Sequence, residues 1–161
     1  MARRTMMILC AAAVAVAAGC GGGGGDSLSK EAYQQELDSA VQKIEQAFNG
    51  LGESLQKVGS GAGSLDAVAD EIGNIQEELN SAADDLDGVS PPEDVEATHE
   101  KFVAGMRALS DDLEEFKKAV DDGDTGAIDE FASNADSLAS VQTLEEATNE
   151  LKEKGYEVGT E

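Results

Sequence analysis

Apolar residues return every three or four positions along most of this chain, the spacing of one face of an α-helix. The first such segment follows Ser29, a helix-capping residue type, with Leu28 and Tyr33 at the positions of a hydrophobic staple. The apolar residues that share one face of this helix, which we call its seam, are spaced alternately four and three residues apart: Leu37, Val41, Ile44, Phe48, Leu51, Leu55 and Val58. Gly50 and Gly52 interrupt this segment without shifting its register. We therefore expect one helix over residues 29–58, bent near the glycines.

A second helix is predicted after the glycine-rich linker 59–63. Ser64 is its expected N-cap, and Gly88 marks its end. The seam again alternates between steps of three and four residues: Leu65, Val68, Ile72, Ile75, Leu79, Ala82 and Leu86.

A third helix is predicted to begin at Pro92, because proline is tolerated in a first helical turn, while Pro91 is kept from α geometry by the proline after it. Its expected seam has the same alternation: Val95, His99, Phe102, Met106, Leu109, Leu113, Phe116 and Val120. Residues 122–124, Asp-Gly-Asp, separate it from the next segment.

The fourth apolar seam is less regular than the other three, and its pattern slips near Val141. It contains Ile128, Phe131, Ala135, Leu138, Val141, Leu144, Ala147 or Thr148, and Leu151. Lys152 and Lys154 favour a helix C-terminus there. Gly155 suits the left-handed residue after that end, and Tyr156 can then fold back onto Leu151.

Four long amphipathic helices with short connections predict an all-α fold, an elongated up-down-up-down four-helix bundle over residues 29–155 with a tail at 156–161. The alternative is a long helical hairpin that dimerises, since the same spacing suits a coiled coil. The short linkers favour the monomeric bundle.

The first 19 residues have the layout of a secretory signal peptide. Arg3 and Arg4 precede the apolar run 6–18, which is shorter than the roughly 20 residues of a membrane-spanning helix. Small residues Ala17-Ala18-Gly19 then precede Cys20. This stretch resembles the lipobox of bacterial lipoproteins, although Ala17 stands where leucine is favoured. An ordinary signal peptide with a chance cysteine is the alternative.

The lipobox resemblance implies that the chain is cut before Cys20 and that Cys20 carries lipid. It also implies a protein anchored in the cell membrane on the extracytoplasmic face. Residues 20–28 then form a glycine-rich tether of roughly 15 Å. Because Cys10 would be removed with the signal peptide, the mature chain would keep a single cysteine and could form no internal disulfide.

Charge narrows the possible partners. The chain has 34 acidic and 11 basic residues, a net charge of −23, and loss of Arg3 and Arg4 would make it −25. Such a chain is a poor ligand for nucleic acid and is repelled by anionic lipid. Strong net charge also favours disorder, but the regular periodicity argues against it. A protein partner would be basic, or bridged by cations.

Residues for catalysis are scarce. With one histidine, no free thiol after lipidation and no nucleophile-elbow sequence, the chain offers little material for a Ser–His or Cys–His pair, so we expect no enzyme. Three acidic clusters do not match the calcium-binding loop and are expected to be solvated: Asp84-Asp85-Asp87, Asp111-Asp112-Glu114-Glu115 and Asp121-Asp122-Asp124.

His99 is the one histidine, and it lies on a predicted seam near one end of the bundle. Two roles stay open: a half-buried structural residue with one nitrogen hydrogen-bonded to a carbonyl or an acid, or a ligand of a metal or haem. Residues 89–131 resemble the second half of cytochrome b562-type bundles. That family ligates haem through a methionine of its first helix and a histidine near the end of its fourth, and this chain has neither. We therefore expect no cofactor and assign no metal ligand.

The sequence favours a non-catalytic, membrane-anchored interaction module of the cell envelope. The layout also resembles small exported helical lipoproteins of bacteria that have no assigned activity. The alternative is an extracytoplasmic binding protein for a divalent metal or a small ligand, at His99 or within the bundle.

Overall fold

The structure, a computed structural model, describes residues 27–158, and the regular secondary structure within that range is all helical. The α-helices are α1 (Lys30–Gly59), α2 (Leu65–Asp87), α3 (Glu96–Asp121), α4 (Thr125–Asn134) and α5 (Ala139–Glu153). Two 3-10 turns, η1 (Glu93–Val95) and η2 (Ala135–Ser137), precede α3 and α5. The all-α class is confirmed. The predicted signal peptide and Cys20 lie outside the described residues.

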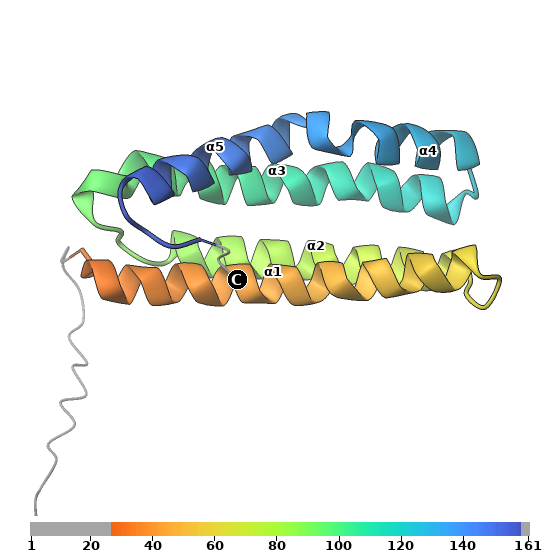
Figure 1. The fold of residues 1–161 in the computed structure, drawn as a ribbon, viewed down its shortest axis with the longest axis horizontal. Coiled ribbons are helices and arrows are strands. Elements are labelled where there is room, and N and C mark those ends of the chain that lie inside the picture. The colour runs from red at the N-terminus through yellow and green to blue at the C-terminus, as the bar shows by residue number, and fades with distance from the viewer. Residues whose placement is uncertain (1–26, 159–161) are drawn as a thin grey trace, which may run out of the picture.

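The helices form two layers (Figure 1). α1 and α2 lie side by side in one layer, and α3 lies in the other with α4 and α5 following one another along it. α2 also packs along α3, whereas no comparable packing joins α1 to α4 or α5 within residues 27–158. We call the end where α1 begins and α5 ends the proximal end, and the opposite end the distal end.

Serine side chains cap the first two helices as predicted. Ser29 Oγ accepts a hydrogen bond from the Ala32 amide at 3.2 Å, and Ser64 Oγ accepts one from the Ala67 amide at 3.3 Å. Gly155 has the predicted left-handed conformation (φ 79°), and the Tyr156 amide donates to the Leu151 carbonyl at 3.0 Å. These bonds satisfy backbone groups that a helix end leaves unpaired.

The third helix begins later than predicted. Pro92 has an extended backbone (φ −56°, ψ 142°), the 3-10 turn starts at Glu93, and α3 starts at Glu96. A proline at the first helical position is permitted but not required. Here Pro91 and Pro92 lie in the connection that crosses from the α1–α2 layer to the α3 layer.

The prediction of a single fourth helix is wrong. α4 ends at Asn134, and Leu138 is extended (φ −62°, ψ 137°) before α5 begins. The polar residues Ser133, Asn134, Asp136 and Ser137 surround the break. Short polar side chains of this kind compete for backbone hydrogen bonds and favour turns over helix. The irregular spacing of apolar residues near Val141 in the sequence reflects this break.

The predicted seams of α2 and α3 are largely buried, whereas those of α1 and of α4 and α5 are only partly so. The α2 seam is buried from Val68 to Leu86, and on α3 only Leu109 is partly exposed. By contrast, Phe48 is 37 % exposed and Leu55 44 % exposed, and Leu65 at the start of α2 is 36 % exposed. The prediction that these three side chains face the core is therefore wrong.

The proximal end is closed by the chain beyond α5. Tyr156 and Val158 are buried, and the Tyr156 ring meets the Tyr33 ring edge-on at 5.6 Å. Gln34 of α1 hydrogen-bonds both the amide and the carbonyl of Glu157. Residues 28–158 thus share one apolar core, which allows this segment to fold without the residues before it.

Candidate functional site

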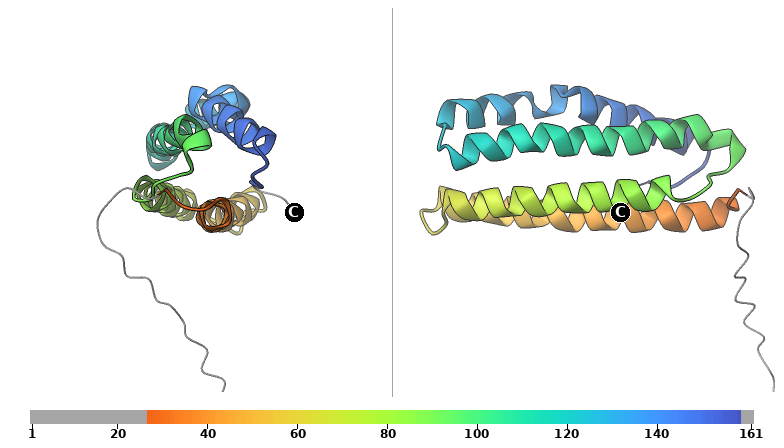
Figure 2. Two further views of the ribbon diagram at one scale, coloured as in Figure 1. Left: turned by 90° about the vertical axis from the view of Figure 1, so that its left-hand side faces the viewer. Right: turned by 180° about the vertical axis from the view of Figure 1, so that it is seen from behind.

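Two features of the described residues invite a functional interpretation. One is the environment of His99 at the proximal end, a residue that the sequence already indicated as a candidate. The other is an uncovered apolar edge of α1 toward the distal end, which the sequence did not predict. His99 lies at the start of α3, near the proximal end, whereas Phe48 and Leu55 lie in the second half of α1, toward the distal end. Figure 2 shows the helices that carry them end-on and from behind.

His99 lies in the first turn of α3 and is only 5 % exposed. Its Nδ1 atom is 2.9 Å from the hydroxyl oxygen of Tyr33 on α1, and the two rings are tilted by 59° with centroids 5.6 Å apart. The pair joins two helices that are distant in sequence. One nitrogen is hydrogen-bonded, but its partner is a tyrosine hydroxyl and not the predicted carbonyl or acid, and the side chain is buried and not half-buried.

Burial sets the ionisation of both rings. Desolvation lowers the pKa of His99, and the nearby carboxylates of Asp87 and Glu100 oppose this more weakly. Burial likewise raises the pKa of Tyr33 well above its ordinary value. Both side chains are therefore neutral at pH 7, and the polar atoms of the pair satisfy one another inside the core.

A cleft of about 450 Å³ lies beside His99. Its lining is strongly acidic: Ser27, Asp87, Val89, Ser90, Pro91, Glu93, Glu96, His99 and Glu100. The carboxylates come from α2, η1 and α3, so they are spread around the cleft. Among residues 27–158, no group of three or more histidine, cysteine or acidic side chains is arranged to hold a metal ion.

Several residues of the acidic clusters form ion pairs, a hydrogen bond or a helix cap. Arg107 binds Asp84 at 2.9 Å and Asp87 at 3.2 Å, and Lys43 binds Asp85 at 2.6 Å. In the other two clusters, Asp112 accepts from Ser140 at 2.5 Å, and Asp124 caps α4 through the amides of Gly126 and Ala127.

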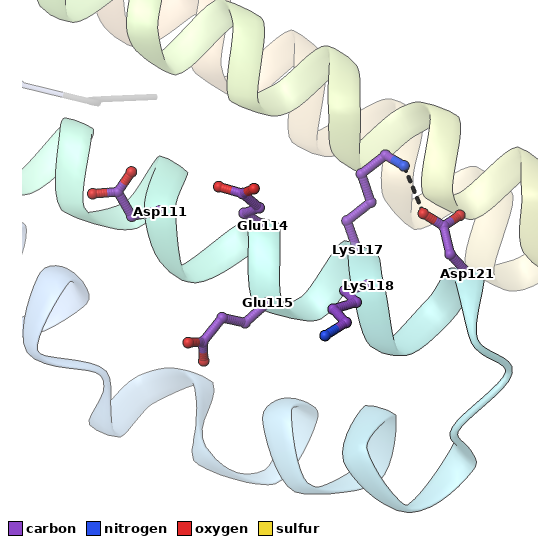
Figure 3. Close-up of a pocket in the computed structure, with 6 residues that line it drawn as sticks. All are labelled: Asp111, Glu114, Glu115, Lys117, Lys118 and Asp121. Carbon is purple, nitrogen blue, oxygen red and sulfur yellow. Dashed lines mark hydrogen bonds and ion pairs between the residues drawn. The ribbon is translucent and has the colours of Figure 1, made fainter.

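A shallow cavity of about 530 Å³ lies along α3 and includes part of the second cluster (Figure 3). Its lining mixes four acids with two lysines: Asp111, Glu114, Glu115, Lys117, Lys118 and Asp121. Lys117 binds Asp121 at 2.8 Å, while Glu115 and Lys118 point the other way, toward α4. The carboxylates do not converge on a common point, so the cavity lacks the geometry of a cation site.

The uncovered edge belongs to α1. Val41, Phe48 and Leu55 are seven residues apart and therefore lie on one line along the helix. We call these three residues the open flank. Val41 is partly buried, whereas Phe48 and Leu55 are exposed. The neighbouring line, Leu37, Ile44, Leu51 and Val58, is buried or partly buried. The open flank is therefore the edge of the core and not a set of scattered surface residues.

Sequence reasoning missed two parts of this arrangement. Tyr33 lies four residues before Leu37, so extending the seam by one step would have placed its ring in the core. The exposure of the open flank left no such signal, since it depends on where α4 lies.

No described helix is long and apolar enough to cross a membrane. Comparisons with protein-family models, curated proteins and solved structures find no match for this chain.

Proposed function

We propose that this protein is a lipid-anchored, non-catalytic interaction module of the bacterial cell envelope. The support for the anchor is the lipobox-like stretch ending at Cys20 and the glycine-rich tether after it. Acylation by two or three chains holds a protein durably on a membrane, at about 0.8 kcal/mol for each buried methylene. In this proposal the cell membrane is the first partner, on its extracytoplasmic face.

The proposed architecture is an up-down-up-down four-helix bundle in which α4 and α5 together form the fourth helix. In support, each helix packs along its neighbour in sequence, and the connections lie alternately at the distal and proximal ends. The bundle is then tethered at its proximal end, and its distal end projects from the membrane.

The open flank is the observation that carries the proposed function. In a soluble monomer, exposed apolar residues are usually scattered singly, whereas a contiguous apolar strip indicates an interaction site. Phe48 and Leu55 lie exposed beside a largely buried line of the core, where a partner would remove them from water. Full burial of a fully exposed side chain of this kind contributes about 1.5–3 kcal/mol, and Phe48 and Leu55, at 37 % and 44 % exposed, would gain a corresponding part of that.

The alternative function, binding of a divalent metal or small ligand at His99, has less support. Tyr33 already uses Nδ1, and the acids around the cleft are spread over three elements.

The anchor can be tested with the Cys20→Ser variant in the native cell. We expect loss of acylation, shown by failure to incorporate labelled fatty acid, and either an uncleaved precursor or release from the membrane fraction. Normal cleavage and membrane retention of this variant would contradict lipid anchoring.

The interaction site can be tested by placing a photo-crosslinking amino acid in α1. Position 52 lies beside Phe48 and Leu55, and a Cβ atom there would meet nothing within 4 Å. Position 53 is exposed on the opposite side of the same helix and is the matched control. We expect a discrete protein adduct in intact cells from position 52 and none from position 53. Equal labelling from both positions, or from neither, would contradict an interaction site at the open flank.

A further inference from the structure

The open flank has the length and regularity of a helix-docking site. Its three residues span about 21 Å, since each residue advances an α-helix by 1.5 Å. Exposure increases along it from Val41, partly buried, to Phe48 and then Leu55. Apolar contacts that repeat every seven residues on a straight helix match the anchor spacing of a second helix laid alongside it.

The position beside the open flank is where α4 would lie if it closed the bundle against α1. Instead, α4 packs against α3, where the rings of Phe131 and Phe116 are stacked with their centroids 4.4 Å apart and an interplanar angle of 11°. α4 buries no residue completely, and its hydrogen bonds within residues 27–158 stay inside the helix or at its cap. Among residues 27–158, a helix-sized edge of α1 is thus left without a neighbouring helix.

Charge indicates what kind of helix fits there. Asp38 and Glu45 precede Val41 and Phe48 by three residues, so they border the open flank on its solvent side, and both are exposed. The three lysines of α1 are already engaged: Lys30 with the Lys154 carbonyl, Lys43 with Asp85 and Lys57 with Glu53. The surface therefore offers an apolar line bordered by unneutralised acids.

We propose that the open flank binds a basic amphipathic helix of a partner protein, laid lengthwise along α1. The apolar face of that helix covers Phe48 and Leu55, and its lysines or arginines lie against Asp38 and Glu45. A second copy of this chain is disfavoured because each copy carries a net charge of −23, and an anionic bilayer is repelled in the same way. This inference rests on the proposed function and names the partner class for the same site.

The test measures binding of a designed 18-residue leucine–lysine amphipathic helix to residues 27–161 by fluorescence anisotropy. A leucine–glutamate helix of the same pattern is the charge control. In the protein, Phe48→Gln with Leu55→Gln removes the apolar line without changing charge. Leu65→Gln is the matched control, because Leu65 is similarly exposed but lies on α2. Phe48→Leu keeps the line apolar.

We expect the leucine–lysine helix to bind, and the double glutamine variant to weaken binding at least about tenfold. Leu65→Gln and Phe48→Leu should stay within about twofold of the parent, and all variants should keep the parent's helical circular-dichroism spectrum. Binding should weaken as salt rises, and the leucine–glutamate helix should not bind.

Several results would overturn the inference. Equal affinity of the parent and the double glutamine variant would mean that the basic helix binds through charge alone, elsewhere on the surface. A dimer in sedimentation that the double variant abolishes would assign the open flank to a second copy. Binding to phosphatidylcholine vesicles that the same variant abolishes would assign it to lipid. If the basic helix fails to bind while position 52 still gives its adduct in cells, the interaction module stands and only the partner class is wrong.

Discussion

The proximal and distal halves of the rod are built from the same amphipathic helices but are held together differently. In the proximal half, side chains link separate helices: Lys43 to Asp85 at 2.6 Å, Arg107 to Asp84 at 2.9 Å and Lys101 to Glu150 at 2.5 Å. In the distal half, the ion pairs among the described residues stay within one helix, Lys57 with Glu53 and Lys117 with Asp121.

The apolar contacts differ in the same way. The proximal half buries Tyr33, Leu37, Leu151 and Tyr156 around the Tyr33–His99 pair, and the chain end folds across them. The distal half leaves Phe48 and Leu55 exposed beside an α4 that buries nothing completely. The distal half also buries apolar residues of α2 and α3, but unlike the proximal half it leaves an apolar edge of α1 exposed.

The largest expected effect compares two leucines of the same helix. Leu37→Ala removes a side chain that is 0 % exposed and should lower the free energy of unfolding by about 2–5 kcal/mol. Leu55→Ala removes one that is 44 % exposed and should cost less than about 1 kcal/mol. Urea unfolding followed by circular dichroism measures both. Similar losses for the two variants would mean that the distal half is as tightly closed as the proximal one.

The next expected effect isolates the proximal hydrogen bond. His99→Leu leaves the buried Tyr33 hydroxyl without its partner and should cost about 1–3 kcal/mol. Adding Tyr33→Phe removes that hydroxyl, so the double variant should recover part of the loss. Thermal unfolding of the two single variants and the double variant gives the coupling free energy. Strictly additive losses would show that the pair contributes no hydrogen bond to stability.

Sequence periodicity predicted where the helices lie because the spacing of apolar residues records which ones share a face. It could not predict that Phe48 and Leu55 remain exposed, because the spacing of apolar residues does not indicate whether another helix covers them. In a closed bundle that neighbour would be α4, which here packs on α3. The role of His99 was open for a related reason: its partner Tyr33 is 66 residues away, beyond the reach of any local pattern.

A smaller expected effect contrasts two glycines. Gly52 lies within α1 at the open flank, where a Cβ atom would meet nothing within 4 Å, so Gly52→Ala should stabilise the protein by about 0.5–1 kcal/mol. Gly105 is buried on α3, and a Cβ atom there would lie 2.9 Å from the Leu144 side chain of α5. Gly105→Ala should therefore destabilise it. Urea unfolding of both variants checks the opposite signs, and a loss of stability in Gly52→Ala would mean that α1 is covered at that position.

The smallest expected effect is the pH response of the proximal half, since it removes no contact. Tyr33, Asp87, Glu93, Glu96 and Glu100 surround the His99 ring from α1, α2, η1 and α3. Burial lowers the pKa of His99 below its ordinary value near 6.5, so the folded state binds a proton less readily than the unfolded chain.

Stability should therefore fall as pH drops through about 6.5, and this contribution is fully lost below the lowered pKa of the folded state. Carboxylate titration at lower pH is common to the parent and to His99→Leu, so it cancels in their difference. The measurement is the unfolding free energy of both proteins between pH 8 and pH 5. We expect the parent to lose stability relative to His99→Leu as pH falls, with no change in their difference above pH 7.5. A difference that is constant over the whole range, or that favours the parent in acid, would show that His99 ionises as freely in the fold as in the unfolded chain.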